Sequence, residues 1–219
     1  MHIKAVTFDV GGTLIEPWPS VGQVYAEVAA RHGVKNVSAE LLQTRFKTAW
    51  RARKRFNDTR AGWEELVDEA FRGLATTPPS KSFFSEIYDR FAQPEAWHVF
   101  EDVRPALESL ATQGLKLGVI SNWDERLREL LCRLQLDVYF DTIVISCEVH
   151  AAKPAPAIFE RAAAILNLPS ASILHVGDSL EMDLRGAEAA GFRSVQVVRR
   201  ERSPGDGPIH SLLQVVGLI

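Results

Sequence analysis

The chain has few cysteines, little net charge and no long apolar run, and each shortage excludes a class of protein. Two cysteines, Cys132 and Cys147, are too few for a disulfide framework, so we expect both to be reduced thiols in the core of a cytoplasmic protein. A formal net charge of -3 gives no basic field for nucleic acid. We also expect no signal peptide and no membrane span. These shortages leave a small molecule as the expected partner.

The sequence also lacks the G-x-x-x-x-G-K-[ST] pattern, which excludes a P-loop nucleotide-binding protein. What it has is the composition of an ordinary globular protein, with 46% hydrophobic and 24% charged residues among 219. That length suits one large domain, or a core domain with an insert. Composition leaves the oligomeric state open, and a monomer is compatible with it.

Periodicity divides the chain into two kinds of region. Between residues 20 and 92, four separate segments have apolar residues at helical spacing, and one of these segments contains Trp63, Leu66, Val67 and Ala70. From about residue 100 onward, helical and strand-like segments alternate, which favours a parallel sheet with helices on both faces. We predict an α/β protein with a doubly wound, Rossmann-like core at residues 1–16 and 97–219. An all-helical domain is inserted at residues 17–96.

The core has an expected element order. The predicted strands span residues 3–9, 117–121, 142–146, 173–177 and 194–198. The predicted helices span residues 103–113, 125–134, 156–166 and 180–190, and a short closing helix spans 209–216.

Polar residues follow four of the predicted strands, and ligands bind at the carboxyl ends of strands in such sheets. In chain order these residues are Asp9, Ser121 with Asn122, Lys153, and Asp178 with Asp183. Three carboxylates brought this close together repel one another unless a cation lies among them. Oxygen ligands with room for water suit Mg²⁺. Lys153 then faces the anion that the metal binds.

The stretch from Asp9 to Thr13 reads Asp-Val-Gly-Gly-Thr and has the features of a phosphate-binding loop. Glycines let the backbone approach a ligand, and a turn of backbone N–H groups can hold an anion. Sugar kinases of the actin-like ATPase fold carry a similar loop, followed directly by a β-hairpin. Pro17 and Pro19 argue against a hairpin here. Trp18 and Trp123 stand beside these motifs and are candidates to line the site.

Together these segments resemble the haloacid dehalogenase-like hydrolase superfamily, in the subgroup with a helical cap between the first two motifs. The resemblance rests on four segments in the right order, at residues 8–14, 119–122, 153–159 and 175–186. It covers the core almost completely. It is weakest in the cap, where substrate choice lies.

The resemblance implies a Mg²⁺-dependent phosphatase for a small phosphorylated metabolite. Asp9 is the implied nucleophile and forms an aspartyl-phosphate. The implied metal ligands are Asp9, the carbonyl of Gly11, Asp178 and Asp183. Lys153 is the implied catalytic cation, offsetting negative charge on the nucleophile and phosphate. Ser121, Asn122 and Thr13 are assigned to substrate binding, and Thr13 also ties the loop.

Gly11 departs from the family pattern, because most of its phosphatases have an aspartate there as general acid and base. Such help is typically worth about 10²–10⁴ in rate, so we expect a preference for leaving groups that need no protonation. Two alternatives stay open: a weak or inactive binding or regulatory protein, and a phosphonatase-like C–P hydrolase. The second needs a Schiff-base lysine from the cap, whose lysines are Lys35, Lys47, Lys54 and Lys81. A metal-independent dehalogenase is disfavoured by Asp178.

Overall fold

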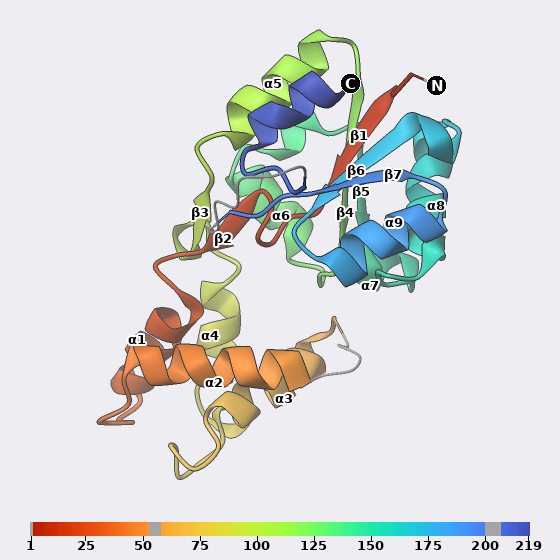
Figure 1. Cartoon of the computed structure of the whole chain (residues 1–219). Helices are drawn as coiled ribbons and strands as arrows, with labels where there is room; N and C mark the ends of the chain where they lie inside the picture. Colours follow the sequence, from red (N-terminus) through yellow and green to blue (C-terminus); the bar gives the residue numbers. More distant parts are fainter. Residues whose placement is uncertain (1, 53–57, 200–206) are drawn as a thin grey trace. The chain divides into compact units, whose positions relative to one another are not determined.

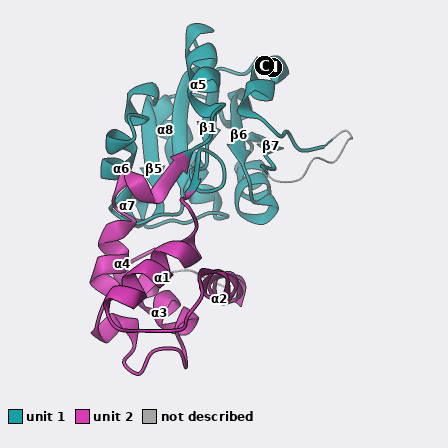
Figure 2. Cartoon of the chain, turned by 90° about the vertical axis from the view of Figure 1, so that its left-hand side faces the viewer, with its two compact units in different colours: residues 1–16, 99–219 teal, residues 17–98 magenta. Residues whose placement is uncertain are grey.

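The computed structural model describes residues 2–52, 58–199 and 207–219 (Figure 1). The chain divides into two compact units (Figure 2). Unit 1 comprises Met1–Glu16 and Val99–Ile219, and unit 2 comprises Pro17–His98. Among the described residues, no helix combines the length and apolarity that crossing a membrane requires.

Unit 1 is built on a five-stranded parallel sheet in the order β5-β4-β1-β6-β7. Its strands are β1 (Ala5–Phe8), β4 (Lys116–Ser121), β5 (Thr142–Ile145), β6 (Ile173–Gly177) and β7 (Arg193–Gln196). Every residue of the central strand β1 is buried, as expected for an apolar run covered on both faces. Phe8 lies level with Val119 of β4 and Val176 of β6, so the residues after these three strands emerge at one edge.

Helices flank the sheet on both sides (Figure 1), which confirms the predicted fold class. The helices of unit 1 are α5 (Val103–Thr112), α6 (Leu127–Arg133), η3 (Asp137–Tyr139), α7 (Ser146–Val149), α8 (Pro156–Leu166), η4 (Ser170–Ser172), η5 (Leu180–Arg185), α9 (Gly186–Ala189) and η6 (Leu212–Leu218). On one face, Ile158 and Phe159 of α8 and Ala187 of α9 pack with Ile120 and Ala5 of the sheet. This packing fixes the sheet edge that carries the polar residues.

Several element boundaries differ from the predicted ones. The single helix expected at 180–190 is a π-helical segment, η5, followed by α9. The closing helix is a 3₁₀ helix that begins at Leu212, because Ser211 and Gln214 form a capping box there. The sequence also did not indicate the two-stranded sheet of β2 (Ile15–Pro17) and β3 (Trp97–Val99), where the chain passes between the units. Pro17 stands at the end of β2, where a strand tolerates proline.

Unit 2 contains the expected run of helices. They are α1 (Val21–Arg31), α2 (Ala39–Ala52), α3 (Arg60–Ala70), η1 (Pro79–Lys81), α4 (Phe84–Arg90) and η2 (Pro94–Ala96). Ser20 and Thr59 cap α1 and α3 through their hydroxyl oxygens, as N-cap residues do. A Cβ on Gly22 would lie 2.1 Å from the carbonyl oxygen of Ala39, so only glycine permits this close approach of α1 and α2.

The expectation of core cysteines is wrong for Cys132, which lies exposed on α6. Cys147 is partly buried and belongs to the short helix α7. Cys132 is exposed because α6 turns Leu127, Leu130 and Leu131 inward instead. Neither cysteine forms a disulfide.

Candidate active site

The loop after β1 is a tight turn held by its own backbone. The carbonyl oxygen of Val10 accepts hydrogen bonds from the N–H groups of Thr13, Leu14 and Ile15, at 3.2, 2.8 and 3.1 Å. Gly12 adopts a φ of 79°, in the left-handed region that favours glycine. A Cβ there would also lie 2.5 Å from a carboxylate oxygen of Asp178. The second glycine is therefore required both by the turn and by the acidic residue beside it.

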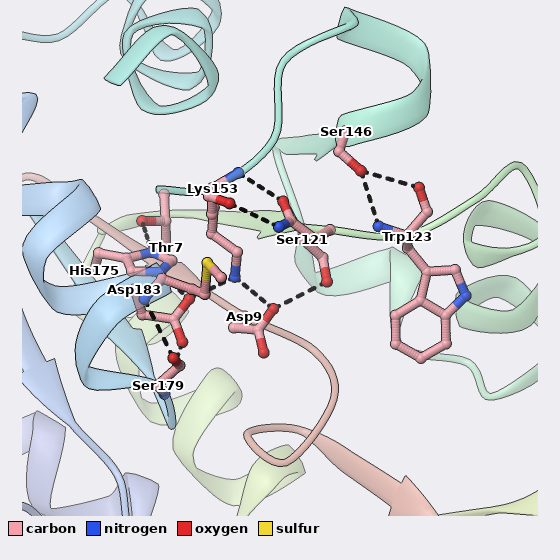
Figure 3. Close-up of polar contacts among 11 residues, drawn as sticks. Thr7, Asp9, Ser121, Trp123, Ser146, Lys153, His175, Ser179 and Asp183 are labelled. Carbon is pink, nitrogen blue, oxygen red and sulfur yellow. Dashed lines mark hydrogen bonds and ion pairs between the residues drawn. The ribbon is translucent and has the colours of Figure 1, made fainter. Parts of the chain in front are cut away.

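A buried ammonium group joins two of the predicted carboxylates (Figure 3). The Nζ of Lys153 donates to Oδ1 of Asp9 at 2.7 Å and to Oδ1 of Asp183 at 2.5 Å. The hydroxyl of Ser121 donates to the same oxygen of Asp9 at 2.9 Å. These four residues come from β1, β4, the segment after α7 and η5, as the common strand edge predicts.

The charged side chains in this cluster shift one another's pKa values. Burial alone would lower the pKa of Lys153 and raise the pKa of Asp183. The attraction between them outweighs burial, so the pKa of Lys153 is raised and the pKa of Asp183 is lowered. At neutral pH the lysine is therefore an ammonium and Asp183 a carboxylate. Burial raises the pKa of Asp9, against the opposing effect of Lys153.

Asp178 completes a group that could hold a metal ion. One ligand atom each from Asp9, Asp178 and Asp183 lie within 4.8 Å of one another. Loss of hydration at its carboxyl group, with repulsion from Asp9 and Asp183, raises the pKa of Asp178 to about 7, although the residue is exposed. An all-oxygen donor set with this much mutual repulsion fits a hard divalent cation. On β7, Gln196 donates its side-chain amide to the carbonyl oxygen of Asp178 at 2.8 Å and holds this loop.

Asn122 lies at the site, but its side chain is engaged with the backbone of Lys153. Its Nδ2 donates to the carbonyl oxygen of Lys153 at 2.9 Å, and its Oδ1 accepts from the N–H of Lys153 at 2.7 Å. The amide of Asn122 therefore fixes the turn that carries the buried ammonium.

Thr13 lies under the loop with its side chain fully buried. Its hydroxyl has no hydrogen-bond partner among the described residues, whereas its carbonyl oxygen accepts from Nη2 of Arg199. Arg199 also pairs with both carboxylate oxygens of Asp102, at 2.9 and 2.7 Å. The sequence did not single out Arg199, because it begins a polar segment and its partner Thr13 lies 186 positions earlier.

His175 is a further buried residue that lies beside Asp183. Its Nε2 lies 3.2 Å from Oδ1 of Asp183, and its Nδ1 lies 3.0 Å from the hydroxyl of Thr7. Burial lowers the pKa of His175, so the neutral ring is favoured. We assign the proton to Nε2, which then donates to Asp183 while Nδ1 accepts from Thr7. In the sequence, a polar ring within an otherwise apolar strand was the signal that could have identified His175 as part of the site.

Trp123 stands next to the loop, as its place after the second motif suggested. The hydroxyl of Ser146 accepts from the N–H of Trp123 at 3.0 Å and donates to its carbonyl oxygen at 3.2 Å (Figure 3). A Cβ built on Gly11 would touch Cζ3 of the indole at 3.4 Å. The other candidate, Trp18, belongs to unit 2.

Comparison with known proteins gives these residues a context. Residues 3–191 match the family described as haloacid dehalogenase-like hydrolase. The chain is 33% identical over 213 residues to haloacid dehalogenase-like hydrolase domain-containing protein 3 of Mus musculus, covering 92% of this chain and 84% of that protein. It is 30% identical over 205 residues to glyceraldehyde 3-phosphate phosphatase of Methanopyrus kandleri, covering 90% and 84%.

A solved structure agrees with these relatives. The crystal structure of a phosphatase of this type from Thermococcus onnurineus superposes with a TM-score of 0.71 and 27% identity, covering 99% of this chain and 97% of that one.

Proposed function

The chain belongs to the haloacid dehalogenase-like hydrolase family, and we propose that this hydrolase is a Mg²⁺-dependent phosphatase acting through an aspartyl-phosphate. The observation that carries the proposal is the convergence of Asp9, Lys153, Asp178 and Asp183 at one sheet edge. The phosphatase-named relatives support a small phosphorylated substrate.

Asp9 is the proposed nucleophile. The ammonium of Lys153 and the hydroxyl of Ser121 both donate hydrogen bonds to Oδ1 of Asp9. This arrangement orients the carboxylate and leaves one oxygen to attack phosphorus, breaking the bond between phosphorus and the leaving-group oxygen. Water then hydrolyses the aspartyl-phosphate and restores Asp9.

The remaining residues have proposed roles that follow from their chemistry. Asp9, the carbonyl of Gly11, Asp178 and Asp183 would hold Mg²⁺, which when bound offsets the charge of the phosphoryl oxygens. Lys153 adds a permanent positive charge at the same place. Ser121 has a hydroxyl that can turn from Asp9 to a phosphoryl oxygen. For Asn122 and Thr13, whose polar side chains lie against or under the backbone, we propose substrate binding through the loops that they hold.

Gly11 limits the proposal to particular substrates. A glycine has no side chain to protonate a leaving alkoxide, which would otherwise contribute about 10²–10⁴ in rate. Aryl and acyl phosphates release a stable anion and do not need this proton. We therefore expect them to be hydrolysed much faster than alkyl phosphates.

The test is hydrolysis of phenyl phosphate by the purified chain with Mg²⁺ and with a chelator. We expect turnover only with Mg²⁺, and its loss in Asp9→Asn, which keeps the shape of the side chain. Arg161→Gln, a change at an exposed helix position, serves as the control for handling and folding. If wild type and Asp9→Asn are equally inert, the phosphatase proposal fails and a binding or regulatory role is favoured, whereas equal turnover would rule out Asp9 as the nucleophile.

A phosphonatase activity has less support. It needs a Schiff-base lysine, and Lys54 lies outside the described residues. Lys35, Lys47 and Lys81 all lie exposed on the surface of unit 2. Borohydride trapping with phosphonoacetaldehyde would reveal such an intermediate as a mass increase on one lysine.

A further inference from the structure

Gly11 and Trp123 form a pair in which an aromatic ring borders the place of the missing side chain. A Cβ on Gly11 would lie at ordinary van der Waals distance, 3.4 Å, from Cζ3 of the indole. The atoms that follow Cβ in a longer side chain would have to pass beside the ring. The indole therefore lines the space into which a residue at position 11 projects.

The backbone that carries this ring is fixed from two sides. Ser146 bonds both the N–H and the carbonyl oxygen of Trp123. The preceding residue, Asn122, is held in the same way by the backbone of Lys153. The side chain of Trp123 is nevertheless only half-buried, so part of the indole is open to a ligand.

We propose that Trp123 is a specificity-determining residue that contacts the leaving group and selects aryl or other flat, apolar ones. The inference rests on the proposed function and extends it to a substrate class. In the reaction, Oδ2 of Asp9 bonds to phosphorus, the bond from phosphorus to the aryl oxygen breaks, and its electron pair stays on that oxygen as a phenolate. No proton from position 11 is needed, and the indole packs against the departing ring.

Phenyl phosphate and ethyl phosphate provide the test, through the ratio of their kcat/KM values. Stacked aromatic pairs contribute enough to change this ratio about two- to tenfold. We expect Trp123→Ala to lower the phenyl-to-ethyl ratio by that factor, mainly through the KM of phenyl phosphate. Trp123→Phe should keep most of the ratio. Ser146→Ala, which loosens the backbone that carries the ring, should lower it in part.

Tyr139→Ala is the matched control. Tyr139 is another half-buried aromatic residue of unit 1, but its hydroxyl bonds Glu108 and it takes no part in the site. We expect an unchanged ratio in this variant. An unchanged ratio in Trp123→Ala, or an equal fall in Tyr139→Ala, would overturn the proposal.

Binding of phenylphosphonate and methylphosphonate separates this inference from the proposed function, because neither measurement requires turnover. Calorimetry with Mg²⁺ should show tighter binding of the phenyl compound to wild type and a loss of that difference in Trp123→Ala. If wild type is inactive but shows this difference, the phosphatase proposal fails and the role of Trp123 stands. If wild type binds both compounds equally, the role of Trp123 is excluded whatever the activity.

The pair also predicts a coupling between positions 11 and 123. Gly11→Asp alone should raise ethyl phosphate turnover little, because the indole restricts the new carboxyl group. Gly11→Asp combined with Trp123→Ala should raise it by at least tenfold more than the two changes separately. Strictly additive effects would show that the ring does not border the acid position in solution.

Discussion

Unit 1 contains a buried cluster of charged and polar side chains, and this cluster contrasts with an exposed ion pair in unit 2. In unit 1, Lys153, Asp183 and His175 are buried and in contact with one another. In unit 2, the ion pair between Arg31 and Glu86 lies at the surface, with side chains 55% and 41% exposed. The interior of unit 2 is instead an aromatic cluster in which Tyr25 packs against Phe46, Phe71 and Phe91.

This difference indicates which interactions stabilise each unit. Burying charges is costly unless they are paired and hydrogen-bonded, so removing one partner of a buried pair in unit 1 should lower its stability strongly. An exposed pair contributes about 0–1 kcal/mol, so unit 2 depends on packing instead. Changing one charge should therefore disturb unit 1 far more than unit 2.

The largest effect is expected from Lys153→Met. It leaves the carboxylates of Asp9 and Asp183 buried without their common cation, which costs about 3–5 kcal/mol and abolishes turnover. Arg31→Met, the matched change in unit 2, should cost less than about 1 kcal/mol. Urea unfolding measures both. Similar losses in the two variants would break the comparison.

Glycine substitutions should affect packing in unit 2 and metal binding in unit 1. Gly22→Ala forces a Cβ against the carbonyl of Ala39, and overpacking of this kind costs about 1–3 kcal/mol or more. Gly12→Ala adds strain at a positive φ and pushes on the carboxyl group of Asp178. We expect calorimetry to show a weakened Mg²⁺ affinity in Gly12→Ala. An unchanged affinity would place Asp178 outside the metal site.

A smaller effect concerns Asp102, which pairs with Arg199. Burial would raise the pKa of Asp102, but hydrogen bonds from Arg199, Ser211 and the backbone N–H of Leu212 lower it. A lowered pKa means stability that is present above about pH 4, the unfolded value, and lost as pH falls through the folded pKa. Asp102→Asn should cost about 1–2 kcal/mol at pH 7, because the pair is partly screened by solvent.

The acid titration of stability checks this assignment. The difference between wild type and Asp102→Asn should shrink as pH falls below about 4, where the wild-type carboxylate becomes protonated. A difference that stays constant down to pH 2 would mean that the charge of Asp102 is not what stabilises unit 1.

The smallest effect has the opposite sign. The pKa of Asp178 is raised to about 7, so its ionisation destabilises the metal-free protein as pH rises from about 4 toward 7 and above. Asp178→Asn removes that charge and should raise the metal-free Tm at pH 8 by a few degrees. It should also remove the Tm increase that Mg²⁺ gives the wild type. If Asp178→Asn had a lower metal-free Tm than wild type, repulsion between Asp178 and the other two carboxylates would not be destabilising the protein.

Periodicity predicted the parallel sheet and the order of its elements. Asp9 and Asp178 stand directly after the apolar strands β1 and β6, and Ser121 ends β4, so strand ends pointed to these residues. Arg199, Gln196 and His175 were missed for a physical reason. Their partners, Thr13, the Asp178 carbonyl and Thr7, are reached only through the folded sheet.

Local chemistry explains the other misses. The segment after Ser179 begins as a π-helix, and its Asp183 contacts Lys153, a long-range contact that helical propensity does not contain. The exposed position of Cys132 depends on which side of α6 meets the core. The pairing of β2 with β3 joins residues more than eighty positions apart.

The contact between Asn122 and Lys153 has a further consequence. A carboxamide that offers one donor and one acceptor to a single residue imitates a peptide group, so the side chain of Asn122 holds the backbone of Lys153 just beyond the end of β4. Asn122 thereby fixes the backbone from which the side chain of Lys153 extends toward the carboxylates. An aspartate at position 122 would keep the shape of the side chain but replace its hydrogen-bond donor with a second acceptor. The charge at the centre of the site is thus positioned by a side chain that serves as a piece of main chain.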